Sequence, residues 1–294
     1  MIRKILFFKF YILLSVQVIA QHAQPRLVLR TDDIGMNHSV NMALKELADT
    51  KIPFSASVMF ACPWYQEAVD ILKKNPQVAV GIHLTLTAEW KFYRWGPVSG
   101  RSAVPSLVDS LGYFLPSVDQ FLSSHYKLEE IETELTAQIE RAVGTGLKIS
   151  YVDPHMGIAM ATPEIRALTE RLAKKYGFGI SAYFGETYKS MWGVSIEAKK
   201  KEFMQFVTTC KPGSLNVVEL HIARDTPEMG ALVDMNSNLM NSEAGKPIAA
   251  QHRQTELNML LSPDFRALNG KKFTLVNYAD VISSNGLGSM KAPE

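Results

Sequence analysis

The chain has 294 residues, a mass of 32.8 kDa and a formal net charge of +2. Its 47% hydrophobic and 20% charged residues are ordinary values for a globular protein and argue against a disordered or fibrous one. Arg3, Lys4 and Lys9 all lie in the first ten residues, and without them the charge falls to −1. The remaining chain therefore lacks the basic excess that binds nucleic acids or anionic membranes.

Residues 1–20 have the pattern of a secretory signal peptide. A basic stretch at 1–9 precedes an uncharged apolar run at 10–20, and Ala20, with Val18 two residues before it, offers a cleavage site. The apolar run is about half of the roughly 20 residues that cross a bilayer, which favours a cleaved signal over a membrane anchor. We therefore expect an exported protein, periplasmic or secreted, that consists of residues 21–294 and is not inserted in the membrane after cleavage.

Short apolar and β-branched runs then alternate with longer segments of helical periodicity. Strands are predicted at residues 26–30, 54–60, 78–83, 147–153, 179–182, 215–221 and 272–276. Helices are predicted at residues 39–50, 64–75, 127–143, 163–176, 196–208 and 253–269. A strand followed by a helix, repeated about seven times, is the signature of parallel βαβ units. We therefore predict a single α/β domain.

Two segments interrupt this alternation, at residues 85–120 and 224–251. The first is too long for a simple connection, and such loops in compact domains are usually functional or disordered. Its content of Trp and Tyr argues against disorder. The chain has only two cysteines, Cys62 and Cys210, and the sequence leaves open whether they form a disulfide.

Acidic and histidine residues collect where the predicted strands end. They are Asp32 and Asp33 after the first strand, His83 at the third, Asp153 and His155 at the fourth, and Glu219 and His221 at the sixth. The carboxyl ends of parallel strands in an α/β barrel meet on one face, where active sites are built. Each residue also has a structural interpretation, because Asp33 could cap the next helix and a histidine could be a hydrogen-bonded core residue.

Two imidazoles and one carboxylate would form a three-ligand site with an open position, which suits a catalytic divalent metal. Such an ion polarises a carbonyl group and can lower the pKa of a bound water to about 7. The second carboxylate of the acidic pair would then serve as a general base on that water. A third histidine across the site could protonate a leaving amine.

Five segments of the sequence resemble the YdjC-like carbohydrate deacetylases, a family that includes chito-oligosaccharide deacetylases. They are TDDIGMNHSVNMAL, GIHLTLT, VDPHMG, VVELHIARD and RQTELNMLLSPDF, and together they span most of the chain after residue 20. The resemblance implies a polysaccharide-deacetylase-like fold, a deformed (β/α) barrel of about seven parallel strands. It also implies hydrolysis of an N-acetyl group from an amino sugar or oligosaccharide, with metal-bound water as the nucleophile and acetate as a product.

By position, the resemblance assigns Asp33, His83 and His155 as metal ligands, Asp32 as the catalytic base and His221 as the candidate acid. Two imidazole ligands favour zinc, with magnesium as the alternative. The sequence departs from the family at three places. Met156, Gly157 and Ile158 replace a His-rich run, Tyr151 replaces a histidine, and Ile222 with Ala223 replaces a Pro-Gly pair.

The sequence leaves the residues that contact the substrate open. Trp90, Tyr93 and Trp95 could form a stacking wall for a sugar ring, or could pack within their own loop. Arg253 could bind the substrate or pair with an acid. Two other functions compete with the deacetylase: a metal-dependent O-acetyl or phosphate esterase on a carbohydrate, and a non-catalytic exported glycan-binding protein. The sequence leaves open whether the chain forms a homo-oligomer.

Overall fold

The computed structural model describes residues 23–241 and 248–293. The predicted signal peptide, residues 1–20, lies outside the described residues. The predicted domain of residues 21–294 is described over most of its length, and its assignment as a single domain stays a prediction. None of the described helices is long and apolar enough to span a bilayer. Cys62 and Cys210 are both free thiols, so they do not form a disulfide in this structure.

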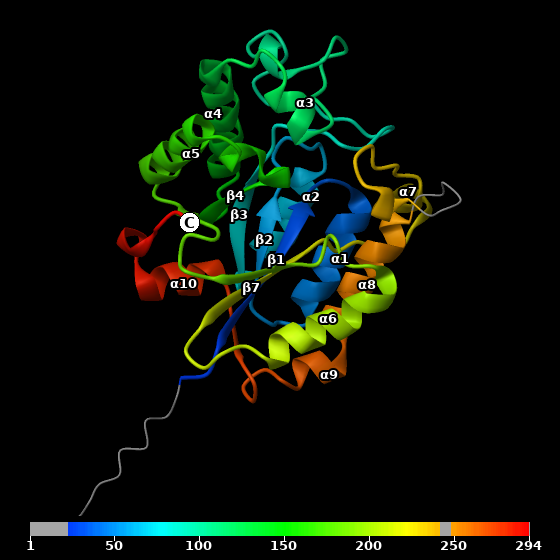
Figure 1. The fold of residues 1–294 in the computed structure, drawn as a ribbon, viewed down its shortest axis with the longest axis vertical. Coiled ribbons are helices and arrows are strands. Elements are labelled where there is room, and N and C mark those ends of the chain that lie inside the picture. Colours follow the sequence, from blue (N-terminus) through cyan, green and yellow to red (C-terminus); the bar gives the residue numbers. More distant parts are fainter. Residues whose placement is uncertain (1–22, 242–247, 294) are drawn as a thin grey trace, which may run out of the picture.

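A single parallel sheet forms the centre of the fold (Figure 1). Its strands are β1 (Arg26–Ile34), β2 (Phe54–Val58), β3 (Val78–Leu84), β4 (Ile149–Pro154), β5 (Gly179–Ile180), β6 (Thr187–Ser190), β7 (Leu215–Leu220) and β8 (Thr274–Val276). Seven of them follow the order β5-β4-β3-β2-β1-β7-β6, and β8 pairs with the first three residues of β1. This sheet confirms the predicted deformed α/β barrel. Its central strands are buried along almost their whole length because both faces of the sheet are covered.

Ten α-helices are described. The longer ones are α1 (His38–Asp49), α2 (Tyr65–Lys73), α4 (Leu128–Gly144), α5 (Pro163–Tyr176), α6 (Ile196–Thr208), α8 (Ala249–Leu261) and α10 (Tyr278–Asn285), and the short ones are α3 (Val118–Leu122), α7 (Pro227–Gly230) and α9 (Pro263–Arg266). Helix α5 begins and ends as its sequence indicates, because the Thr162 side chain caps its first turn and Gly177 adopts the left-handed conformation after its last. Helix α1 is capped by Asn37 rather than by Asp33. Asp33 is therefore free for another role.

The structure differs from the predicted elements at three places. The helix expected at residues 253–269 begins four residues earlier and ends at Leu261, because Pro263 cannot continue it and instead starts α9. Strand β6 was missed because its sequence, Thr-Tyr-Lys-Ser, is polar and partly exposed. Helix α10 was also missed. The segment at 85–120 has little regular structure, and it covers the end of the sheet where the strands finish (Figure 1).

Arg30 joins the two edges of the curved sheet. No backbone pairing between β5 and β6 occurs among the described residues, and the chain passes from one edge to the other through residues 181–186. The Arg30 guanidinium donates hydrogen bonds to Ser181 Oγ (2.7 Å), which follows β5, and to Tyr188 Oη (3.0 Å) in β6. This buried side chain therefore closes the barrel where the backbone does not.

Candidate active site

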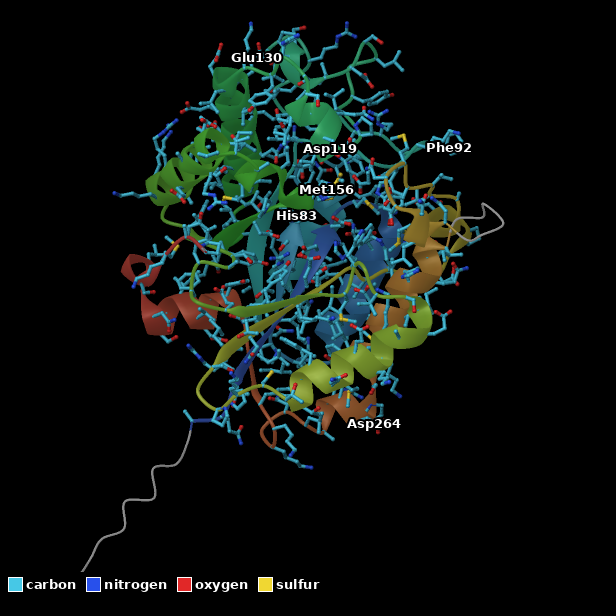
Figure 2. The ribbon with its side chains drawn as sticks, in the orientation of Figure 1. His83, Phe92, Asp119, Glu130, Met156 and Asp264 are labelled. Carbon is cyan, nitrogen blue, oxygen red and sulfur yellow. The ribbon has the colours of Figure 1, made fainter. Side chains whose placement is uncertain are left out.

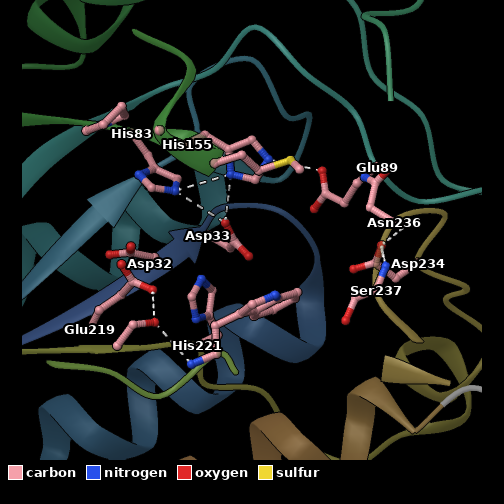
Figure 3. Close-up of a pocket in the computed structure, with 15 residues that line it drawn as sticks. Asp32, Asp33, His83, Glu89, His155, Glu219, His221, Asp234, Asn236 and Ser237 are labelled. Carbon is pink, nitrogen blue, oxygen red and sulfur yellow. Dashed lines mark hydrogen bonds and ion pairs between the residues drawn. The ribbon is translucent and has the colours of Figure 1, made fainter. Parts of the chain in front are cut away.

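The carboxyl ends of β1, β3, β4 and β7 open into a pocket with a volume of about 440 Å³ (Figure 3). The five residues predicted as metal ligands, base and acid all line it: Asp32, Asp33, His83, His155 and His221. The expectation that these strand ends converge is therefore met. The chemical roles of these five residues stay predictions.

Asp33, His83 and His155, here called the ligand triad, present three donor atoms to one point. Asp33 Oδ1 lies 3.4 Å from His83 Nε2 and 3.3 Å from His155 Nδ1, and the two nitrogens are 3.3 Å apart. Two ligands of a tetrahedral zinc ion, each 2.0–2.1 Å from it, lie about 3.3–3.4 Å from each other. Asp33 Oδ1 is also buried and accepts no hydrogen bond. The triad therefore fits a divalent cation.

A backbone irregularity turns both adjacent aspartates toward the pocket. Successive residues of a regular strand point to opposite faces of the sheet, so Asp32 and Asp33 would normally diverge. Here the pairing of β1 with β2 shifts register between Thr31 and Ile34, and Asp33 has a φ of 61°. Left-handed conformations of residues other than glycine are costly and cluster at functional sites. The bulge therefore gives the pocket a candidate metal ligand and a neighbouring carboxylate from one strand.

Each triad residue is held through its other polar atom. His83 Nδ1 lies 2.9 Å from Asp153 Oδ2, and His155 Nε2 lies 3.0 Å from Glu89 Oε2. Arg253 Nη2 donates to Asp33 Oδ2 at 2.6 Å. Such partners fix the ring orientation and tautomer of metal-binding histidines.

Two of these partners were not assigned by sequence reasoning. The sequence placed Asp153 at a strand end but assigned it no function. Glu89 lies in the long segment at 85–120, where no sequence pattern distinguishes a functional carboxylate from a structural one.

Arg30 binds a second set of acids beside the triad. It donates two hydrogen bonds to Asp32, from Nε to Oδ1 (2.8 Å) and from Nη2 to Oδ2 (2.7 Å), and a third to Glu219 Oε2 (2.9 Å). Burial raises the pKa of Asp32 although Arg30 opposes this shift. Burial also raises the pKa of Glu219 to about 7, and repulsion from Asp32 and Asp153 adds to that shift. The sequence signal for Arg30 is a charged residue inside an otherwise apolar stretch of the first strand.

The site holds more negative than positive groups. Five carboxylates belong to Asp32, Asp33, Glu89, Asp153 and Glu219, and the two guanidinium groups belong to Arg30 and Arg253. Burial works to lower the pKa of both triad histidines, but the neighbouring carboxylates outweigh it, so the pKa of His83 is raised and that of His155 rises to about 9. A divalent cation would carry the two positive charges that the protonated rings supply.

His221 lies on the other wall of the pocket, beside Asp32 and Glu219 (Figure 3). Its backbone N–H donates to Glu256 Oε2 at 2.6 Å, and its ring lies 4.8 Å from the ring of Trp192. Its Nδ1 is buried and has no hydrogen-bond partner among the described residues. Burial lowers the pKa of His221 well below its usual value, so the imidazole is neutral at neutral pH.

The structure buries most of the aromatic side chains that the sequence offered as sugar contacts. Trp90 and Trp95 are buried, Trp95 Nε1 donates to the Thr87 carbonyl, and the Tyr93 hydroxyl donates to the Met36 carbonyl. The Trp90 ring lies against the Arg253 guanidinium and the Trp95 ring against His155 and Tyr93, and none of the three aromatic residues lines the pocket.

Arg253 is also buried, and it pairs with Asp33, which is the second of the two roles that the sequence left open for it. The apolar parts of the pocket wall come instead from Trp192 and Met156.

Comparisons with known proteins agree with the geometry. The model of the YdjC-like protein family matches residues 26–269. A carbohydrate deacetylase from Brevibacillus brevis is 36% identical over 151 residues, which cover 51% of this chain and 56% of that protein. Carbohydrate deacetylase 1 from Listeria innocua is 29% identical over 199 residues, covering 63% of this chain and 77% of that protein. The match thus spans little more than half the length of the Brevibacillus relative.

A crystal structure of an Enterococcus faecalis protein, proposed to cleave cellobiose phosphate, has a similar fold. The TM-score is 0.68 and the sequence identity is 21%, with 88% of this chain and 99% of that chain covered. Agreement at this level of identity concerns the fold alone, and it supports the deformed barrel described above.

Proposed function

This chain belongs to the YdjC-like protein family, and we propose that it is a metal-dependent carbohydrate deacetylase. Its reaction would be the hydrolysis of an N-acetyl group on an amino sugar or oligosaccharide, which gives acetate and a free amine. The observation that carries the proposal is the ligand triad, whose three donor atoms lie 3.3–3.4 Å apart beside a carboxylate and an imidazole in one pocket. The relatives named as carbohydrate deacetylases support the substrate class.

A divalent cation held by the triad would polarise the amide carbonyl and lower the pKa of a water molecule. Asp32 is the carboxylate nearest in sequence to the triad, and its two hydrogen bonds from Arg30 fix its orientation. Its raised pKa makes it a stronger base than an exposed aspartate, so Asp32 would take the proton of the attacking water. The water oxygen adds to the amide carbon, and the C–N bond then breaks.

His221 would protonate the departing nitrogen. Its lowered pKa means that its conjugate acid is strong, so a proton acquired during the reaction passes readily to an amine. Asp32, Glu219 and His221 lie close enough for their polar atoms to be within 4.8 Å of one another, so a proton has a short route between base and acid.

Zinc is the ion that the triad favours. Adjacent ligands of octahedral magnesium, which binds at about 2.1 Å and prefers oxygen, lie about 3.0 Å apart, which is closer than the observed separations. From the signal-peptide pattern of residues 1–20 we also propose that the protein acts outside the cytoplasm, on periplasmic or external glycans.

Among the alternatives, a phosphate esterase is disfavoured. No lysine or arginine is among the described residues that line the pocket, whereas a phosphate site normally supplies basic side chains. An O-acetyl esterase would use the same groups and differ only in the bond broken.

The test is acetate release by residues 21–294 from N-acetylglucosamine oligosaccharides, with zinc-loaded and chelator-treated protein. We expect release that depends on the metal and is lost in His83→Ala. His125→Ala is the matched control, because His125 is exposed and lies outside the pocket. Absence of acetate with every divalent metal would contradict the proposal, and release of acetate from O-acetylated sugars only would favour the esterase.

A further inference from the structure

The end of the pocket farthest from Asp32 and Glu219 holds a buried carboxylate with an available oxygen (Figure 3). Asp234 is only 4% exposed, yet it lines the pocket. Its Oδ1 accepts backbone hydrogen bonds from Asn236 (2.7 Å) and Ser237 (3.0 Å). Its Oδ2 accepts none from the described residues, and no described cation pairs with it. A carboxylate oxygen removed from bulk water is costly unless a ligand binds it.

The backbone holds Asp234 rigidly relative to the ligand triad. Residues 90 and 234 form an antiparallel bridge. On either side of it, the Lys91 N–H donates to the Val233 carbonyl (2.9 Å), and the Met235 N–H donates to the Glu89 carbonyl (3.0 Å). Because Glu89 also binds His155, Asp234 is tied to the residue that orients a triad histidine. Its free oxygen therefore lies at a fixed place in the pocket.

We propose that Asp234 is a specificity-determining residue, whose Oδ2 accepts hydrogen bonds from the hydroxyl groups of the sugar that carries the reacting acetamido group. The inference rests on the proposed deacetylase function and narrows its substrate class. Sugar hydroxyls are donors that a carboxylate oxygen can bind in pairs, and hydrogen bonds to a charged group are the stronger ones.

The Asp234 carboxylate should also disfavour the binding of anionic sugars, because like charges repel each other. The pocket is lined by carboxylates from Asp32, Asp33, Glu89, Glu219 and Asp234, and its described lining contains no lysine or arginine. A phosphate or carboxylate substituent placed at the Asp234 end would meet a buried like charge, with no lysine or arginine beside it among the described residues that line the pocket. The substrate is therefore an uncharged N-acetylated saccharide rather than a sugar phosphate or a uronic acid.

The conservative variant Asp234→Asn distinguishes a role of Asp234 in sugar binding from a role in holding the turn at 234–237. The amide oxygen of asparagine can still accept the two backbone hydrogen bonds, so the turn at 234–237 should persist. The negative charge and the second acceptor oxygen are lost. Asp264→Asn is the matched control, because Asp264 is exposed on α9 at the other end of the molecule (Figure 2).

The experiment measures binding by calorimetry of two probes to the zinc-loaded protein: the N-acetylglucosamine disaccharide, and the same disaccharide with a 6-phosphate. Wild type should prefer the uncharged probe. In Asp234→Asn, affinity for that probe should fall about ten- to hundredfold, and the discrimination against the phosphate should shrink. With the uncharged substrate, the variant's KM should rise while kcat changes little. Asp264→Asn should match wild type throughout.

Equal affinity of wild type and Asp234→Asn for the uncharged probe would overturn the inference, as would a wild-type preference for the phosphorylated one. Thermal unfolding of both variants checks that the fold is intact. If the expected binding pattern appears but no acetate is released, the deacetylase proposal fails and the role of Asp234 in sugar binding stands. If wild type binds neither probe, the role of Asp234 is overturned, and acetate release still decides the deacetylase proposal separately.

Discussion

The carboxylate behind His83 gives a quantitative test of the ligand triad. Asp153 Oδ2 lies 2.9 Å from His83 Nδ1, and both side chains are almost completely buried. In Asp153→Asn the amide oxygen can still accept from the ring, but the charge is lost. A hydrogen bond to a charged group contributes about 1.5–3 kcal/mol and a neutral one about 0.5–1.5 kcal/mol. The difference, about 1–2 kcal/mol, corresponds to roughly a 5- to 30-fold loss of zinc affinity.

The assay is competition for zinc with a chromophoric chelator, on purified wild type, Asp153→Asn and the control Asp119→Asn. Asp119 is exposed on α3 and lies outside the pocket (Figure 2), so this control should bind zinc like wild type. The calculated loss overlaps the lower part of the 10- to 100-fold range that is typical of such outer partners. An unchanged zinc affinity in a folded Asp153→Asn protein would refute the reasoning, because it would mean that His83 Nε2 is not a ligand.

Three further predictions concern protons and catalysis. Zinc binding to the metal-free protein near pH 7 should release about two protons, because the pKa of His83 is raised and that of His155 is about 9. Calorimetry in buffers of different ionisation enthalpy measures this proton release. Release of less than one proton would contradict the assignment of the triad. For the same reason, zinc affinity should fall as the pH is lowered from about 9. The pKa of Glu219 is 4.5 in the unfolded chain and about 7 in the folded protein, so between these pH values the folded state binds this proton more strongly. The contribution of Glu219 to the free energy of unfolding should therefore decrease as the pH increases from 4.5 to 7. Denaturant unfolding of metal-free Glu219→Gln should show a smaller loss over that window, and an unchanged pH dependence would count against the shift. Asp32→Asn should keep its zinc, by elemental analysis, and lose about 10²–10⁴-fold in kcat, and a near-normal rate would show that Asp32 is not the base.

The sequence predicted the parts of the site that depend on the sheet. His83, His155 and His221 were found because residues at the carboxyl ends of parallel strands must converge, whatever the loops do. The sequence also placed Asp32 and Asp33 at this site, but it did not predict the bulge that turns both side chains into the pocket, because a bulge of this kind has no clear sequence signal.

Residues that reach the pocket from loops could not be predicted in the same way. Glu89 and Asp234 come together through a backbone bridge between two segments that are far apart in the chain, and neither segment has a repeating pattern. The sequence left two roles open for the aromatic residues of the first segment. Composition alone does not distinguish a buried tryptophan such as Trp90 from one that faces a ligand.

Because of the bulge in β1, the proposed catalytic residues and the proposed specificity residue lie on different parts of the fold. The spacing between the ligand Asp33 and the carboxylate of Asp32 is set by one peptide unit of a central strand, so movements of the surrounding loops cannot alter it. Asp234 belongs instead to a peripheral loop that is attached to the barrel by a few backbone contacts. Exchanging the loop that carries Asp234, with Glu89 kept in place to hold His155, would therefore change which saccharide is accepted while the spacing of Asp32 and Asp33 stays the same.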